Sequence, residues 1–218
     1  MTQSFDCIIK HPCRFLISGA SGSGKTELVV DLLLNHENVF ENKPERIYVF
    51  YQHDQTAYNR LSANSEIPVV FVEGAPTDDF VPVRHSTIVF DDLQELDSAV
   101  ITTWFTRRAH HHSCDVIYLV QNLFSQNKTQ RDISLNSNYI CLFRARRDVG
   151  QLEKLNYQLL GSGHKNFLPR VFKEATSDRA HSYLFVDLEE GTPDAFRFRD
   201  SVVPVHGKTS VYVPVAQR

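Results

Sequence analysis

The most informative segment of this chain is Gly19-Ala20-Ser21-Gly22-Ser23-Gly24-Lys25-Thr26, which fits the phosphate-binding pattern G-x-x-x-x-G-K-[ST] in full. Glycines at both ends let the backbone wrap so that successive N–H groups point at phosphate oxygens. The helix that follows such a loop presents its positive end to the same anion. The pattern therefore predicts that all eight residues bind a nucleotide. Lys25 would reach the outer phosphates, and the Thr26 hydroxyl would bind Mg²⁺.

The sequence on either side of this loop has the order of strand, loop and helix that the motif requires. Residues 13–17 form a short, mostly apolar run that is typical of a buried parallel strand, and they lead directly into the loop. After the loop, Leu28, Val29, Leu32 and Leu33 recur at helical spacing, which predicts an amphipathic helix packed on the sheet. The alternative interpretation is a glycine-rich turn without a ligand.

Length and composition indicate a single domain. With 218 residues, of which 42% are hydrophobic, the chain can bury one sizeable core. We expect one phosphate-loop domain over residues 1–200 and a tail or docking segment over residues 201–218, with no separate domain ahead of the loop. The formal net charge of −3 argues against a protein that coats nucleic acid by total charge, although a few basic loops could still contact DNA.

Two further features bear on the protein's environment. No apolar run approaches the roughly 20 residues of a membrane span, and polar residues rather than a secretory leader follow Met1. The four cysteines, at positions 7, 13, 114 and 141, have neither C-x-x-C spacing nor the density of a disulfide scaffold. We therefore expect a soluble, intracellular protein with reduced thiols. The less favoured alternative is a zinc site that combines Cys7, His11 and Cys13 with residues 110–114.

Apolar segments after the loop predict a sheet. Runs rich in β-branched and aromatic residues predict strands over residues 46–51, 67–72, 87–92, 116–120 and 138–143, and Pro68 favours an edge position for the second of these. A helix is expected near residues 150–160. Residues 183–188 and 195–199 are expected to form a hairpin. The predicted fold is an α/β three-layer sandwich with a mostly parallel central sheet and a C-terminal β-hairpin.

A pair of acids follows the strand at residues 87–92. Because ligands gather at the carboxyl ends of parallel strands, Asp91 is expected to hold Mg²⁺, and Asp92 is placed to polarise the attacking water. The alternative for either aspartate is the N-cap of the next helix.

A glutamine and a group of arginines follow the last two central strands. Gln121 would face the γ-phosphate, where it could orient water or report hydrolysis, or it could simply satisfy loop backbone. Arg144, Arg146 and Arg147 could form a solvated face, an arginine finger offered to a neighbouring subunit, or a contact with a phosphate backbone.

With these segments the sequence resembles the HerA/FtsK-type genome-packaging ATPases of large and mid-sized eukaryotic DNA viruses, poxvirus-like ones among them, and of virus-like transposons. The resemblance covers about the first two thirds of the chain. It depends on the phosphate loop, residues 88–92, residues 118–124, residues 131–136 and residues 143–148. It implies a P-loop NTPase of the RecA-like (ASCE) type that uses ATP and Mg²⁺.

The resemblance also implies a function and roles for individual residues. The family forms homo-oligomeric rings that move double-stranded DNA into a preformed viral capsid, which implies a capsid or portal-vertex partner and a location in an infected cell or virion. Carried over by position, Lys25 and Thr26 bind phosphate and Mg²⁺, Asp91 supports the metal, Asp92 activates water and Gln121 senses the γ-phosphate. Relatives often have glutamate in place of Asp92. The trans-acting arginine is expected to be Arg131, followed by Arg147 and Arg146.

Three other interpretations start from the same residues. A small-molecule or nucleoside kinase could use this loop, with the arginine cluster in a lid, and a nucleotide-bound scaffold could hydrolyse poorly. A nuclease is not expected, because the acids at positions 187, 189, 190 and 194 are most simply the solvated turn of the hairpin.

Histidines 110–112 are expected to be exposed at the negative end of a helix, although they could also contact DNA or a neighbouring subunit.

Overall fold

The computed structural model describes residues 6–93, 98–123, 128–144, 149–177, 180–204 and 207–215. Within them the strands form one sheet in the order β3-β2-β4-β5-β1-β6-β7-β8, in which β7 runs antiparallel to both of its neighbours, β6 and β8, and the other pairs are parallel. The strands are β1 (Arg14–Ser18), β2 (Ile47–Tyr51), β3 (Val69–Glu73), β4 (Thr87–Asp91), β5 (Asp115–Val120), β6 (Tyr139–Phe143), β7 (Tyr183–Asp187) and β8 (Phe198–Arg199).

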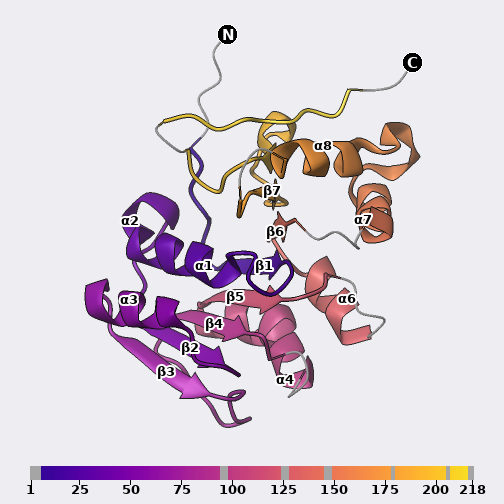
Figure 1. Ribbon diagram of the computed structural model, residues 1–218. Coiled ribbons are helices and arrows are strands. Elements are labelled where there is room, and N and C mark those ends of the chain that lie inside the picture. The colour runs from indigo at the N-terminus through magenta and orange to yellow at the C-terminus, as the bar shows by residue number, and fades with distance from the viewer. Residues whose placement is uncertain are drawn as a thin grey trace.

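Helices cover both faces of this sheet (Figure 1). On one face lie α1 (Lys25–Leu34), α2 (His36–Val39) and α3 (Thr56–Asn64). On the other lie α4 (Ser98–Thr103), the π-helix η1 (Trp104–Arg108), α5 (Ala109–His112), α6 (Lys128–Leu135), α7 (Val149–Leu160) and α8 (Phe167–Ala175). Two 3₁₀ turns, η2 (Gly161–His164) and η3 (Asp194–Phe196), complete the assignment. The predicted three-layer α/β architecture is confirmed.

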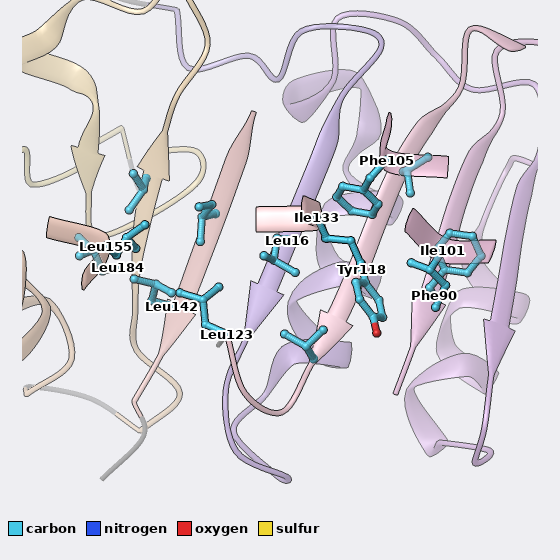
Figure 2. Close-up of a cluster of buried hydrophobic side chains, with 14 of the residues drawn as sticks. Leu16, Phe90, Ile101, Phe105, Tyr118, Leu123, Ile133, Leu142, Leu155 and Leu184 are labelled. Atoms are coloured by element: carbon cyan, nitrogen blue, oxygen red, sulfur yellow. The ribbon is translucent and has the colours of Figure 1, made fainter. Parts of the chain in front are cut away.

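The alternation of side chains along the central strands creates two apolar cores. On β1, Phe15 and Ile17 belong to the cluster beneath α1 and α3, whereas Leu16 belongs to the cluster beneath α4 and α6. Figure 2 shows the second cluster, in which Phe90 and Tyr118 from the strands face Phe105 from the π-helix. Both faces of the sheet are thus buried, which explains why its strands are almost continuously apolar.

The predicted strands agree with the structure to within a residue or two. β3 lies at the edge of the sheet, where the proline before it can be tolerated. All four cysteines are free. Four helices that the sequence analysis did not identify are present, namely α2, α3, α6 and α8. None of the helices in the described ranges has the length and hydropathy needed to span a bilayer.

The C-terminal region differs from expectation in two ways. The second strand of the hairpin is only two residues long, because residues 194–196 form the turn η3. Asp187 was expected in a solvated turn, and this is wrong. Its side chain is 2% exposed and pairs with Arg199, whose Nη2 lies 3.2 Å from Asp187 Oδ2. A buried carboxylate needs such a partner, and the antiparallel pairing of β7 with β8 supplies it.

Part of the expected tail is docked on the sheet. Val211 forms an antiparallel bridge with Arg199, and the Tyr212 N–H donates to the Phe198 carbonyl over 2.9 Å. The Asp200 carboxylate accepts hydrogen bonds from Thr209 and Ser210. These contacts extend the edge of the sheet beyond β8.

Candidate nucleotide-binding site

The order of the central strands brings the motif residues together. β5 lies between β1 and β4, so the loop after β1, the acids at the end of β4 and Gln121 after β5 meet at one edge of the sheet. Backbone hydrogen bonds fix the junctions: the Gly19 N–H donates to the Val120 carbonyl over 3.1 Å, and the Asp92 N–H donates to the Leu119 carbonyl over 3.3 Å. The carboxyl ends of three parallel strands thus form one site.

Two glycines of the loop sit where a side chain would not fit. A Cβ atom at Gly19 would lie 2.5 Å from Phe143 Cβ, which is closer than real contacts allow. Gly24 has a φ of 100°, and a Cβ atom there would lie 3.1–3.2 Å from atoms of the His181 side chain. Because Gly24 is also the N-cap of α1 and offers no side chain, the first N–H groups of that helix are available to an anion.

Lys25 is folded back onto its own loop. Its Nζ donates to the carbonyl oxygens of Gly19 at 2.7 Å and Ala20 at 3.0 Å. Burial lowers the pKa of this ammonium group, and the neighbouring carboxylates of Asp91 and Asp92 oppose that effect. The side chain therefore stands at the centre of the loop, held only by neutral oxygens that an anionic phosphate can replace.

Asp91 is the most strongly held side chain of the site. It is 3% exposed, and its Oδ2 accepts hydrogen bonds from Thr26 Oγ1 at 3.0 Å and Gln55 Nε2 at 2.9 Å. The Tyr58 hydroxyl, from α3, donates a short hydrogen bond to the same oxygen. Burial raises the pKa of Asp91, while the donors Tyr58 and Thr26 and the charge of Lys25 lower it. Three donors on one oxygen fix the orientation of the carboxylate.

The Asp92 side chain contacts Gln121, which follows the carboxyl end of β5. Gln121 Nε2 donates to both of its carboxylate oxygens, at 3.1 Å and 2.8 Å. The backbone of Asp92 is left-handed, with a φ of 57°, a conformation in which aspartate is over-represented among residues with side chains. Asp92 is half-buried and Gln121 is exposed, so solvent water reaches this pair. The described part of α4 begins at Ser98, after residues that lie outside the described ranges, so the N-cap alternative for these aspartates stays a prediction.

These residues line a cavity of about 400 Å³. Its walls are formed by residues 21–27, His53, Gln55, Asp91, Asp92, Gln121 and His181. His181 comes from the segment before β7, and its Nδ1 donates to the Ser23 carbonyl over 2.9 Å. The sequence analysis missed His53, Gln55, Tyr58 and His181, since no motif marks them: the first three come from the connection between β2 and α3 and from α3 itself, and His181 comes from the segment before β7.

The donor set fits a hard divalent cation such as Mg²⁺. Thr26 Oγ1 and Asp91 Oδ2 are neighbouring oxygens, and burial of the carboxylate is only partly offset by hydrogen bonds. In the described part of the chain, no three His, Cys, Asp or Glu side chains gather around a common point. A bound Mg²⁺ would therefore take its remaining ligands from nucleotide and water, as this ion commonly does.

The arginines expected to act on a neighbouring subunit lie outside this cavity. Arg131 is exposed on α6, and Arg144 is exposed after β6. Arg146 and Arg147 lie outside the described residues. The roles of all four in catalysis stay predictions.

The residues proposed for zinc do not assemble. His11 Nδ1 pairs with Asp115 Oδ1 at 3.0 Å, and the same oxygen accepts the Cys13 N–H at 2.7 Å. Histidines 110–112 lie at the end of α5, as expected, and His110 and His111 are exposed, whereas His112 is half-buried.

Comparison with solved structures supports the fold directly. Two structures of the genome-packaging NTPase B204 from Sulfolobus turreted icosahedral virus 2 match over nearly the full length of both chains. The complex with ATP-γS has a TM-score of 0.51 at 12% identity and covers 94% of this chain and 98% of B204. The complex with AMPPCP has a TM-score of 0.50 at 11% identity and covers 93% and 97%. This chain has the fold of a P-loop ATPase.

A bacterial structure gives the same result. The second and third ATPase domains of EssC from Geobacillus thermodenitrificans match with a TM-score of 0.51 at 9% identity, over 93% of this chain and 40% of that one. No protein-family model and no curated protein sequence matches the chain. The P-loop ATPase fold confirms the predicted fold class, and at the level of fold it agrees with the resemblance to HerA/FtsK-type packaging ATPases.

Proposed function

We propose that the protein is an ATP-hydrolysing motor that moves double-stranded DNA into a viral capsid. The observation that carries this proposal is the convergence of two hydrogen-bonded pairs, Thr26 with Asp91 and Gln121 with Asp92, around one cavity at the phosphate loop. The first pair suits the binding of a metal-bound triphosphate, and the second suits the activation of a water molecule. ATP hydrolysis requires both roles. The shared fold with a genome-packaging NTPase supports the same reading.

Each residue has a distinct part in the proposed reaction. Lys25 exchanges its loop carbonyls for the outer phosphates of ATP, and N–H groups of the loop and of the first turn of α1 bind the remaining phosphate oxygens. Thr26 and Asp91 would hold Mg²⁺, which supplies neutralisation of charge on the phosphates. Asp92 accepts a proton from water as the water oxygen bonds to the γ-phosphorus, and the bond to the bridging oxygen breaks to leave ADP.

Gln121 links this chemistry to the presence of substrate. In the structure its amide donates to both oxygens of Asp92, which occupies the carboxylate oxygens that would otherwise accept a proton from water. A γ-phosphate oxygen can replace Asp92 as the acceptor of the Gln121 amide. The base is then free only when triphosphate is bound.

The remaining parts of the proposal concern assembly. A ring of identical subunits would place the exposed Arg131 of one copy at the active site of the next, where it stabilises charge on the transferring phosphoryl group. Residues 1–200 form the motor domain in this scheme. The docked tail beyond it offers a surface for a capsid or portal-vertex protein.

The test is steady-state ATP turnover measured with and without duplex DNA, alongside particle mass in solution. We expect DNA to stimulate turnover, Lys25→Ala to abolish it and ATP to favour a closed ring around duplex. A phosphorylated small-molecule product, with no response to DNA, would instead identify a kinase. ATP cleavage that is unchanged in Lys25→Ala would leave only a nucleotide-bound scaffold.

A further inference from the structure

A second charged surface lies at the opposite end of the parallel strands from the nucleotide site. It is built on the amino-terminal ends of β4 and β5. Arginine and histidine side chains gather there from two segments that are distant in sequence. We call it the basic surface, and it consists of Arg84, Arg107, Arg108, His110, His111 and His112. Arg84, Arg107, His110 and His111 are exposed, and the other two are half-buried.

Backbone contacts hold the two segments side by side. The His85 N–H donates to the Ser113 carbonyl over 3.0 Å, and the Asp115 N–H donates to the Ser86 carbonyl over 3.0 Å. Cys114 Sγ lies 3.7 Å from the Val83 carbonyl oxygen. Arg84 is thereby fixed beside the end of α5, although it enters from the loop before β4.

The π-helix fixes the arginines of the second segment. Its first residue, Trp104, is fully buried, and the Arg108 guanidinium lies 5.4 Å from the centre of the indole. Arg108 Nη2 also donates to the Asp78 carbonyl. The centre of the His112 ring lies 5.7 Å from that of the same indole, with the two rings tilted by 40°. Such π-helical turns are uncommon and frequently mark functional sites, and here the turn presents Arg107 to solvent.

Negative charge does not balance this surface. Among the residues that the structure describes, no carboxylate forms an ion pair with any member of the basic surface. Asp78 contacts Arg108 through its backbone carbonyl rather than its carboxylate, and the Asp79 carboxylate accepts a hydrogen bond from Thr77. Burial and then the charges of Arg108, His111 and Arg84 lower the pKa of His112. A chain with a net charge of −3 therefore has three arginines on one face that form no ion pair with a described carboxylate.

We propose that the basic surface binds the phosphate backbone of double-stranded DNA, an inference that rests on the proposed function. Exposed arginines spread over two elements suit a row of phosphates. The aromatic ring at the centre, Trp104, is 0% exposed, so it cannot stack on an unpaired base. Stacking on exposed aromatic rings is a main source of affinity for single strands, and the six residues of this surface include no phenylalanine, tyrosine or tryptophan, which favours the duplex.

The test compares the salt dependence of duplex binding in two matched variants. Arg84→Ala/Arg107→Ala removes two exposed charges from the basic surface. Arg170→Ala/Lys173→Ala removes two exposed charges from α8 and serves as the control. Each phosphate contact contributes about 0.9 to the slope of log K against log salt concentration, so we expect the slope to fall by about 1.8 in the first variant. The control should keep the slope of the wild-type protein.

The readouts separate this inference from the function on which it rests. ATP turnover without DNA should be the same in both variants and the wild-type protein, since neither pair touches the nucleotide cavity. If the wild-type protein binds duplex and the first variant has an unchanged slope, the basic surface is not the DNA contact, although the motor proposal survives. If the wild-type protein neither binds duplex nor responds to it, both proposals fail. Equal losses in the two variants would show a diffuse charge effect and would overturn the inference.

Discussion

Replacing Tyr58 by phenylalanine tests the geometry of the metal-binding carboxylate. The Tyr58 hydroxyl is one of three donors to Asp91 Oδ2, and it is buried, so water cannot replace it without rearrangement. A hydrogen bond to a charged group contributes about 1.5–3 kcal/mol. Each 1.4 kcal/mol corresponds to about a tenfold change in a binding constant. Loss of this hydrogen bond should therefore weaken Mg²⁺ binding by roughly 10- to 100-fold. Mutation of a residue that hydrogen-bonds to a metal ligand typically changes metal affinity by about this much.

The assay is ATP turnover as a function of Mg²⁺ concentration. We expect Tyr58→Phe to need roughly 10- to 100-fold more Mg²⁺ for half-maximal turnover, with the site otherwise intact. Tyr51→Phe is the matched control, because its ring lies 5.5 Å from that of Tyr58 and it makes no hydrogen bond to Asp91. The acid limb of the pH profile should also move upward, since loss of a donor to the carboxylate raises the pKa of Asp91 further.

The result that would refute this reasoning is specific. If Tyr58→Phe keeps the Mg²⁺ dependence of the wild-type protein and unfolds at the same temperature, Tyr58 does not orient Asp91. A lower unfolding temperature with unchanged Mg²⁺ dependence would give the hydroxyl a purely structural role.

The remaining predictions concern the base, a buried ion pair and a buried histidine. Asp92→Asn should still bind ATP but lose at least about 100-fold in single-turnover cleavage, because the proton acceptor is gone; cleavage at the wild-type rate would exclude it as the base. Arg199→Ala should lower the free energy of unfolding by about 3–5 kcal/mol in denaturant titrations, since it leaves a buried carboxylate unpaired, whereas the surface variant Arg197→Ala should lower it by less than about 1 kcal/mol. The hydrogen bond to Asp115 raises the pKa of His11, so its stabilisation is complete below about pH 6.5 and is lost as pH rises through the raised value. His11→Asn should therefore destabilise the protein more at about pH 6 than at about pH 8.5, and a cost independent of pH would contradict this.

The central sheet could be predicted from sequence because its strands are buried on both faces. Residues 87–91, for example, are all buried in the structure, and a run of that kind has few other interpretations. The helix α3 was missed because only Ala57, Tyr58 and Leu61 of its nine residues are buried, which leaves a weak periodic signal. α2, with four residues, is too short to show any period.

The site was predictable only as far as local sequence defines it. The loop around Lys25 and the strand ends at Asp91 and Gln121 carry their chemistry in short motifs, and the fold brings them together. Tyr58 and His181 contribute through contacts across the fold that no local pattern records. The wrong expectation for Asp187 has the same cause. Its partner Arg199 meets it only through the pairing of β7 with β8, so the acidic turn appeared solvated.

The central position of β1 has a consequence for how the chain reaches its native state. Arg14 pairs with Val116 and Phe15 pairs with Tyr139, while Cys13 and Asp115 bond across 102 positions of sequence. During synthesis the ribosome releases β1 long before it has made β5 or β6. The apolar β1 segment therefore remains unpaired until those strands emerge. Long-range parallel pairing of this kind is slow and exposes the chain to aggregation. Shortened forms that stop before β6 should consequently accumulate as insoluble material.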